Sequence, residues 1–291
     1  MIMDVSNNGG QRNEEDVQYY TVSSRWFVFS LPVISSMLSF VACLMAYIIG
    51  VNNGTLKSLP FVPFISDTGN FKPSSSIFTL FLILSSFASL SIVLIRFYQV
   101  AASKHNSLVT ANKIALSFGV IFVLGKVIVS SFQLSSSMLI HYLAAGIYFL
   151  GATIYALLQT YISGKILGKV TKTRFIEDGR WRRECITYVF RIICCCGLIC
   201  NLLLFGIFAT VPSLSIHNRD GANVAQGAEW ALAVFKIFFL LTFLNDFWNI
   251  EYTFEVKFRD MTSSSERDLD QPDHVMFNTR NDRVNLAYQF S

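Results

Sequence analysis

Two lysines lie inside long apolar stretches of the sequence, where charged side chains are rare. Lys126 and Lys236 are each expected about 10 Å along a helix from the same end of their spans. A charge inside a bilayer is costly and marks a candidate functional site. Either lysine could pair with Asp67, Glu229 or His141 in a polar cap or a site for a lipid headgroup. The alternative is that each lysine snorkels to the membrane surface.

The His and Cys residues show no pattern typical of a metal centre or a nucleophile. The four His residues (His105, His141, His217 and His274) are scattered and form no i,i+4 pair. Cys194, Cys195 and Cys196 are consecutive, so on a helix they point about 100° apart and cannot converge on one ion. We expect them to pack in the core, with palmitoylation of a cysteine near the surface, best placed at Cys185, as the alternative. The sequence predicts no cofactor, no metal and no enzymatic activity.

The composition is that of a membrane protein. The chain has 291 residues, of which 53% are apolar and 14% charged, and its mean hydropathy is +0.47. Soluble domains carry roughly 25% charged residues. Because continuous apolar runs of roughly 20 residues span a bilayer as helices, we predict an all-α polytopic bundle of six transmembrane helices. The predicted spans are about 27–50, 77–97, 114–132, 138–162, 186–211 and 229–247. They form a membrane domain at 27–250, between an N-terminal segment (1–26) and a disordered tail (251–291).

The distribution of Lys and Arg predicts the orientation of these spans. Cytoplasmic loops are enriched in basic residues, and the termini and the second-to-third and fourth-to-fifth connections hold most of them. The other face has only Lys57, Lys72 and Arg219. Both termini are therefore expected in the cytoplasm. The sequon that begins at Asn53 lies on the opposite, outer side, where N-glycosylation is feasible.

The fourth-to-fifth connection is the most basic part of the chain. Its candidate contacts for anionic lipids are Lys165, Lys169, Lys172, Arg174, Arg180, Arg182 and Arg183. Each such charge contributes about 1 kcal/mol near an anionic leaflet. The loop could equally do no more than set the topology, or it could bind a cytoplasmic protein, as the tail could. No feature of the chain predicts binding to nucleic acid.

The first outer loop holds the most distinctive motif. It reads Pro63, Phe64, Ile65, Ser66, Asp67, Thr68 and Gly69. Proline favours an extended entry, Ser and Asp can bond nearby backbone N–H groups, and Gly permits a positive φ, so we expect a tight turn. The motif resembles the P-[YF]-I-S-D-T-G hallmark of the damage-regulated autophagy modulator (DRAM) family, within the wider Frag/DRAM/Sfk group.

Shorter motifs support this resemblance from about residue 27 to residue 247. They are Arg96-Phe97-Tyr98-Gln99-Val100, Asn112-Lys113, Phe132-Gln133, Leu158-Gln159-Thr160, Ala228-Glu229-Trp230, Leu241-Thr242-Phe243 and Asp246-Phe247. The chain departs from the family pattern at Lys72-Pro73 and Ser76, and Lys126 and Lys236 lie outside it. Asp246 ends the last span, where we expect a solvated carboxylate.

The resemblance implies a six-span, non-enzymatic protein of lysosomal or endosomal membranes that promotes autophagy. It supplies no catalytic residue and no cofactor. The wider group also offers two alternatives, a plasma-membrane protein that helps to recruit a phosphatidylinositol 4-kinase complex and a factor that remodels lipids or GPI anchors. A transporter is less favoured, because no pair of spans is broken by Gly or Pro. The outer-loop motif could serve either packing or binding.

Overall fold

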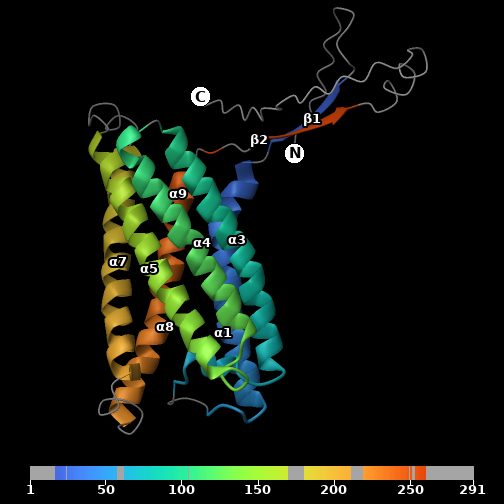
Figure 1. The fold of residues 1–291 in the computed structure, drawn as a ribbon, viewed down its shortest axis with the longest axis vertical. Helices are drawn as coiled ribbons and strands as arrows, with labels where there is room; N and C mark the ends of the chain where they lie inside the picture. Colours follow the sequence, from blue (N-terminus) through green and yellow to red (C-terminus); the bar gives the residue numbers. More distant parts are fainter. Residues whose placement is uncertain are drawn as a thin grey trace, which may run out of the picture. The chain divides into compact units, whose positions relative to one another are not determined.

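Six helices of the structure are long and apolar enough to cross a membrane, which confirms the predicted fold class. The computed structural model describes residues 17–23, 25–57, 62–103, 105–169, 180–210, 219–248, 250 and 253–259. The six helices, shown in Figure 1, are α1 (Arg25–Asn52), α3 (Ser74–Ala102), α4 (Val109–Ser131), α5 (Met138–Lys169), α7 (Arg180–Thr210) and α8 (Arg219–Leu241). These apolar stretches are helical because a helix satisfies its own backbone hydrogen bonds in lipid.

Within the residues that the structure describes, three short helical elements lie at the ends of these spans. They are α2 (Ile65–Thr68), the 3-10 helix η1 (Asn106–Leu108) and α9 (Phe243–Phe247). Helix α2 covers one end of the bundle, hereafter the α2 end, and α9 continues α8 at the other, the α9 end. Several helices extend beyond the predicted spans, because hydropathy marks only the part of a helix that matches hydrocarbon.

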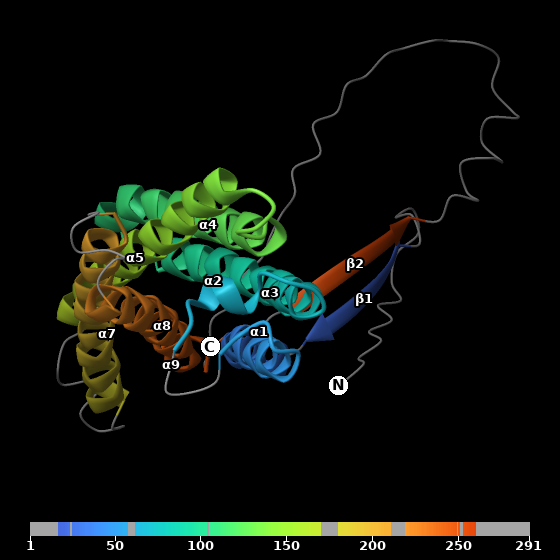
Figure 2. The same ribbon diagram turned by 90° about the horizontal axis from the view of Figure 1, so that it is seen from below.

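Within residues 24–252 the six long helices pack in chain order as a closed ring. Helix α1 contacts α3, each later helix contacts the next, and α8 returns to α1, while α5 also contacts α8 across the ring. Figure 2 shows this arrangement along the helix axes, with α2 lying across the end of the bundle. The core between the helices is apolar and includes the buried aromatic residues Phe122, Tyr155, Phe239 and Phe243.

Helices α4 and α5 approach each other closely through glycines. A Cβ added at Gly125 would lie 2.7 Å from the backbone nitrogen of Tyr148, and one at Gly151 would lie 3.2 Å from Phe122. Small residues allow close helix packing in membranes. The outer faces are apolar: Phe87 and Leu139 are 66% and 72% exposed. Such faces suit lipid contact.

Residues that flank the bundle form a two-stranded antiparallel ribbon. Strand β1 (Val17–Ser23) pairs with β2 (Thr253–Arg259), with Val17 opposite Arg259 and Ser23 opposite Thr253. Strand β2 lies in the segment that the sequence analysis predicted to be a disordered tail. The reason is visible in the chain: Phe254, Val256 and Phe258 alternate with polar residues, which is the period of a strand.

Candidate functional site

The outer-loop motif, Pro63–Gly69, folds as a lid on the α2 end of the bundle. Phe64 is extended, with φ −60° and ψ 148°, and α2 begins at the next residue. The backbone N–H of Ile65 donates to Oε2 of Glu229 on α8 at 2.7 Å. Next to it, Nε1 of Trp230 donates to the carbonyl oxygen of Pro63 at 2.8 Å. Two consecutive residues of α8 therefore fix the backbone of the motif.

Gly69 has a different role from the one that the sequence suggested. Its φ is −94°, so this position does not require a positive φ. A Cβ at Gly69 would instead lie 2.5 Å from the ring of Phe78 on α3. The expectation of a left-handed residue is wrong here, and the glycine is needed because the ring of Phe78 packs against its α-carbon.

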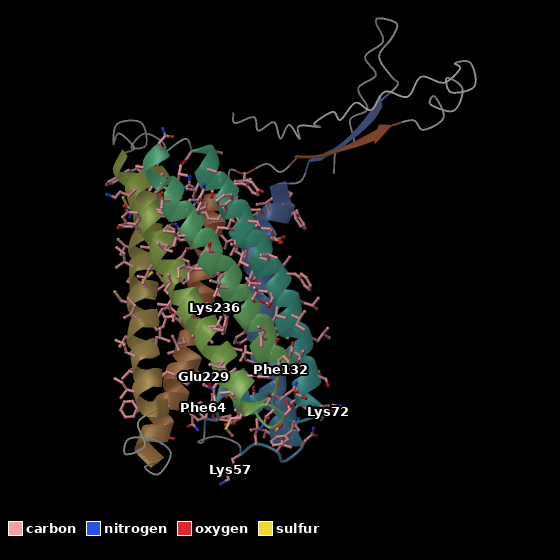
Figure 3. All side chains as sticks on the ribbon, in the orientation of Figure 1. Lys57, Phe64, Lys72, Phe132, Glu229 and Lys236 are labelled. Carbon is pink, nitrogen blue, oxygen red and sulfur yellow. The ribbon has the colours of Figure 1, made fainter. Side chains whose placement is uncertain are left out.

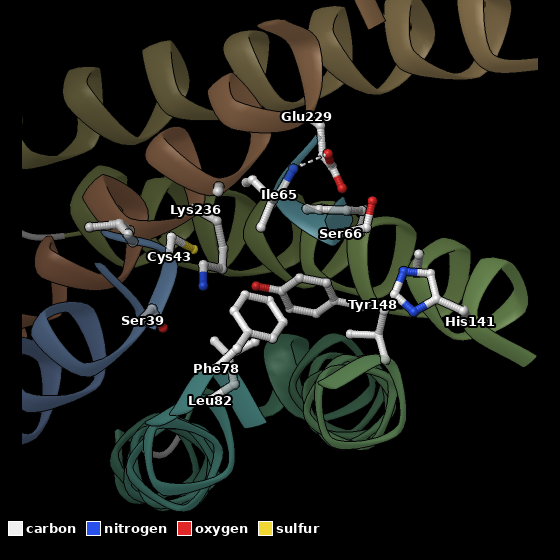
Figure 4. Close-up of a pocket in the computed structure, with 15 residues that line it drawn as sticks. Ser39, Cys43, Ile65, Ser66, Phe78, Leu82, His141, Tyr148, Glu229 and Lys236 are labelled. Carbon is white, nitrogen blue, oxygen red and sulfur yellow. Dashed lines mark hydrogen bonds between the residues drawn. The ribbon is translucent and has the colours of Figure 1, made fainter. Parts of the chain in front are cut away.

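A cavity of about 60 Å³ lies beneath the lid. Its walls come from α1, α2, α3, α4, α5 and α8 and are mostly apolar. Figure 4 shows the polar side chains that line it, which are Ser39, Ser66, His141, Tyr148, Glu229 and Lys236. One buried water needs roughly 10–15 Å³, so the space suits a few waters or one small ion.

The structure places three of the four predicted polar-cap residues around this lid cavity, and the fourth directly behind it. His141, Glu229 and Lys236 line the cavity, and Lys126 donates to Ser39, which lines it too. Figure 3 shows Glu229 near the α2 end and Lys236 deeper in the bundle. The residues that the sequence analysis grouped in one polar cap are therefore neighbours in the structure.

The contacts of these residues differ from the predicted ones. Within the described part of the chain, neither lysine forms an ion pair. Glu229 instead accepts from the motif backbone, and Nδ1 of His141 lies 2.7 Å from the carbonyl oxygen of Phe132. Lys126 is 0% exposed and Lys236 is 5% exposed, so snorkelling is wrong as well. Both ammonium groups remain inside the bundle.

Lys126 is held by a cluster of serines between α1 and α3, which sequence reasoning missed. Its Nζ donates to Oγ of Ser85 at 2.5 Å and to Oγ of Ser39 at 3.1 Å. Those two hydroxyls lie 2.7 Å apart, and Ser35 and Ser89 extend the cluster with a contact of 2.8 Å. The signal was present in the sequence, because Ser35 and Ser39, like Ser85 and Ser89, are spaced i,i+4 and share a helix face.

Asp67 lies in the lid, outside the spans, and partial burial raises the pKa of its carboxyl above the usual value. A backbone hydrogen bond at Phe64 and the charge of His141 act in the opposite direction. Because burial disfavours the charged form, protonation of Asp67 stabilises the folded lid.

A second polar cluster joins three helices at the α9 end. Asp246 on α9 forms ion pairs with Arg96 on α3, at 2.9 Å, and with Arg191 on α7. All three side chains are at most 10% exposed. The expectation of a solvated carboxylate at Asp246 is therefore wrong. Two arginines reach it from neighbouring helices and exclude water, and we call these three residues the Arg–Asp–Arg network.

Further hydrogen bonds engage other donors of the two arginines. Arg96 donates to Gln159, Gln99 and Ser163, and Arg191 donates to Ser163 and Thr242, over 2.5 to 3.2 Å. The ring of Phe243 lies 5.8 Å from Cζ of Arg96 and 5.0 Å from Cζ of Arg191. The family-like motifs contain most of these residues, so the motifs are the signal by which the cluster could have been found.

The other predicted sites have few described contacts. The side chains of Lys165, Arg182 and Arg183 are exposed, Lys169 and Arg180 lie in helices, and Lys172 and Arg174 fall outside the described residues. Asn53 is exposed just beyond α1. In the described part of the chain, no three His, Cys, Asp or Glu residues cluster as metal ligands would. Cys194 and Cys195 are buried in the core, whereas Cys196 and Cys200 are exposed.

The fold and these two clusters define a multi-pass membrane protein whose described residues form six helices long enough to span a membrane, with a lidded cavity at one end and a buried ion network at the other. The sequence of residues 27–250 matches the family model described as the Frag1/DRAM/Sfk1/Cwh43P N-terminal domain. The chain belongs to this family.

Curated relatives agree with this assignment over most of their length. DNA damage-regulated autophagy modulator protein 2 from Homo sapiens is 26% identical over 250 residues, which cover 81% of this chain and 91% of that protein. DNA damage-regulated autophagy modulator protein 1 from Xenopus laevis is 30% identical over 236 residues, 75% and 89% of the two chains. Modulator of macroautophagy TMEM150B-B from Xenopus laevis is 24% identical over 245 residues, 84% and 96%. No solved structure matches the chain.

Proposed function

We propose that this protein modulates autophagy from lysosomal or endosomal membranes, and that it does so without catalysing a reaction. The observation that carries the proposal is family membership over residues 27–250, together with relatives whose names describe autophagy modulators. The buried charged groups support a non-enzymatic role, because Glu229 holds the lid and Asp246 holds two arginines. These groups serve the assembly of the bundle.

We further propose that the α9 end faces the cytoplasm and the lid faces the lumen. The exposed Lys165, Arg182 and Arg183 lie at the α9 end, which fits the enrichment of basic residues in cytoplasmic loops. Six spans return the chain to its starting side, and the pairing of β1 with β2 agrees with this. Exposed Asn53 then lies in the lumen as an acceptor for a glycan. An Asn53→Gln variant that lacks the electrophoretic shift of the wild type would support both statements.

The compartment and the activity can be tested in one cell line. The protein is removed, autophagic flux is measured, and an internally tagged copy is scored against lysosomal and plasma-membrane markers. We expect lysosomal or endosomal location and reduced flux that the wild-type copy restores. A Glu229→Ala copy, which loses the acceptor for the lid, should restore flux less well than the matched Gly146→Ala copy, because a Cβ at Gly146 meets nothing.

Other outcomes of this experiment contradict the proposal. Plasma-membrane location with normal flux and altered phosphoinositides would favour recruitment of a phosphatidylinositol 4-kinase, with the basic loop or the tail as the docking site. Altered GPI-anchor lipids with normal flux would favour lipid remodelling. Equal rescue by Glu229→Ala and wild type would show that the lid has no part in flux.

A further inference from the structure

The lid cavity contains a buried cation that is not neutralised within the described part of the chain. Lys236 is 5% exposed, and Figure 4 shows its ammonium group pointing into the cavity. Its Nζ lies 5.5 Å from the centroid of the Tyr148 ring, but forms no hydrogen bond or ion pair with the described residues. An ammonium group has three donors and no acceptor, so a bound group with acceptor capacity would satisfy it.

A second cation lies behind the first. Lys126 is fully buried, and its charge and that of Lys236 act on one another. Ser39 connects the two sites, because it lines the cavity and accepts a hydrogen bond from Lys126 at 3.1 Å. The partners of Lys126 are hydroxyls, which carry no opposite charge. The region therefore holds two lysine side chains where the surrounding medium is hydrocarbon.

The nearest carboxylate of the cavity wall is engaged elsewhere. Glu229 lies seven residues before Lys236 on α8, which places it about 10 Å away along the helix. Its Oε2 accepts the N–H of Ile65 at 2.7 Å, so it is bound to the lid. Burying an unpaired charge is costly. A negatively charged ligand inside the cavity would remove that cost.

We propose that the lid cavity binds one small monovalent anion of the size of chloride or bromide, with Lys236 as its direct ligand and Lys126 and Ser39 behind it. A volume of about 60 Å³ accommodates an ion or a few waters, but not a phospholipid headgroup or an acyl chain. The apolar walls, formed by residues such as Phe78, Leu82 and Phe149, favour a single charge over a multiply charged anion. This inference is independent of the proposed role in autophagy.

The test measures thermal unfolding of the full chain, purified in detergent, while potassium gluconate is replaced stepwise by potassium chloride at constant ionic strength. An anion that binds only the folded state raises the unfolding temperature with its concentration. At ten times its dissociation constant it shifts the folding equilibrium about eleven-fold. We expect chloride and bromide to stabilise the wild type in a saturable manner, and Lys236→Met to abolish this dependence.

A matched control separates binding from general effects of salt. Lys113 is an exposed lysine on α4, the helix that carries Lys126, and Lys113→Met should keep the wild-type response. If Lys236→Met fails to fold, the line width of ³⁵Cl in nuclear magnetic resonance reports directly on the wild type. We expect broadening that bromide reverses. No broadening, or a chloride response that Lys236→Met retains, would overturn the proposal and indicate that the lysines are buried without an anion.

Discussion

Replacing Asp246 with Asn should be among the most destabilising single substitutions in the bundle. Asp246 is the shared partner of Arg96 and Arg191, whose side chains are 4% and 2% exposed. Asparagine keeps the size of the side chain but removes its charge, so two buried guanidinium groups lose their common counter-charge. Removing one partner of a buried ion pair typically costs about 3–5 kcal/mol.

Neighbouring groups place the expected cost near the lower end of this range. Glu184 also acts electrostatically on both arginines and on Asp246, and would offset part of the loss. The hydrogen bonds that Arg96 donates to Gln159, Gln99 and Ser163 do not depend on the carboxylate. We therefore expect a loss of about 3 kcal/mol. For a chain of this size that corresponds to a drop in melting temperature of about 6–12 °C.

The assay compares melting temperatures of detergent-purified variants by size-exclusion chromatography after heating. Arg191→Met should cost less than Asp246→Asn, because it leaves Arg96 and Asp246 as a neutral pair. The double variant should be more stable than the sum of the two single effects predicts, since the residues are in contact. If Asp246→Asn has the same melting temperature as the exposed-site control Ser117→Ala, the carboxylate does not hold the helices together.

Three further predictions concern the lid and the packing of α4 on α5. Glu229→Gln should be mild because the amide oxygen still accepts the Ile65 N–H, whereas Glu229→Ala should cost about 1–3 kcal/mol, and equal melting temperatures of the two variants would contradict this. Asp67→Asn should stabilise the protein relative to wild type at neutral pH, with the difference shrinking as pH falls towards the ordinary carboxyl pKa. The sign follows from burial, which raises the pKa of Asp67 in the folded state. The stability contributed by protonated Asp67 is therefore present at low pH and is lost as the pH rises through the folded-state pKa. A stability difference between variant and wild type that grows on acidification would refute this prediction. Gly125→Ala should cost about 1–3 kcal/mol because its Cβ would meet the backbone of Tyr148, while Gly146→Ala, which meets nothing, should be neutral or stabilising in the same melting assay.

The sequence predicted the number and approximate positions of the spans because each depends only on a local run of apolar residues. It also placed His141, Glu229 and Lys236 near one another, because their depth follows from their distance to a span end. Depth says nothing about the direction in which a residue faces around its helix. The i,i+4 serines mark a polar face on α1 and another on α3, but their spacing does not show that both faces meet Lys126 on α4. Those contacts follow only from the packing of the three helices.

The Arg–Asp–Arg network is a second set of contacts that the local sequence does not predict. Arg96 and Arg191 lie near span ends, where basic residues mark the cytoplasmic side. Nothing in the local sequence shows that both reach Asp246, which lies 150 and 55 positions away in the chain. Only the ring of six helices brings the three together. The β1–β2 ribbon was not predicted for a different reason. The alternation of apolar and polar residues in β2 is local, but it extends over only seven residues.

The position of Asp246 in the chain has a consequence for biosynthesis. A membrane protein is made from its N-terminus, so Arg96 enters the membrane with the second span and Arg191 with the fifth. Their shared carboxylate is synthesised only with the end of the sixth span. Until then the nascent bundle holds two cations without this anion. Insertion of the last helix thus supplies the counter-charge for two arginines on helices that were made earlier. A chain that ends before Asp246 differs from the finished one in that Arg96 and Arg191 lack this carboxylate.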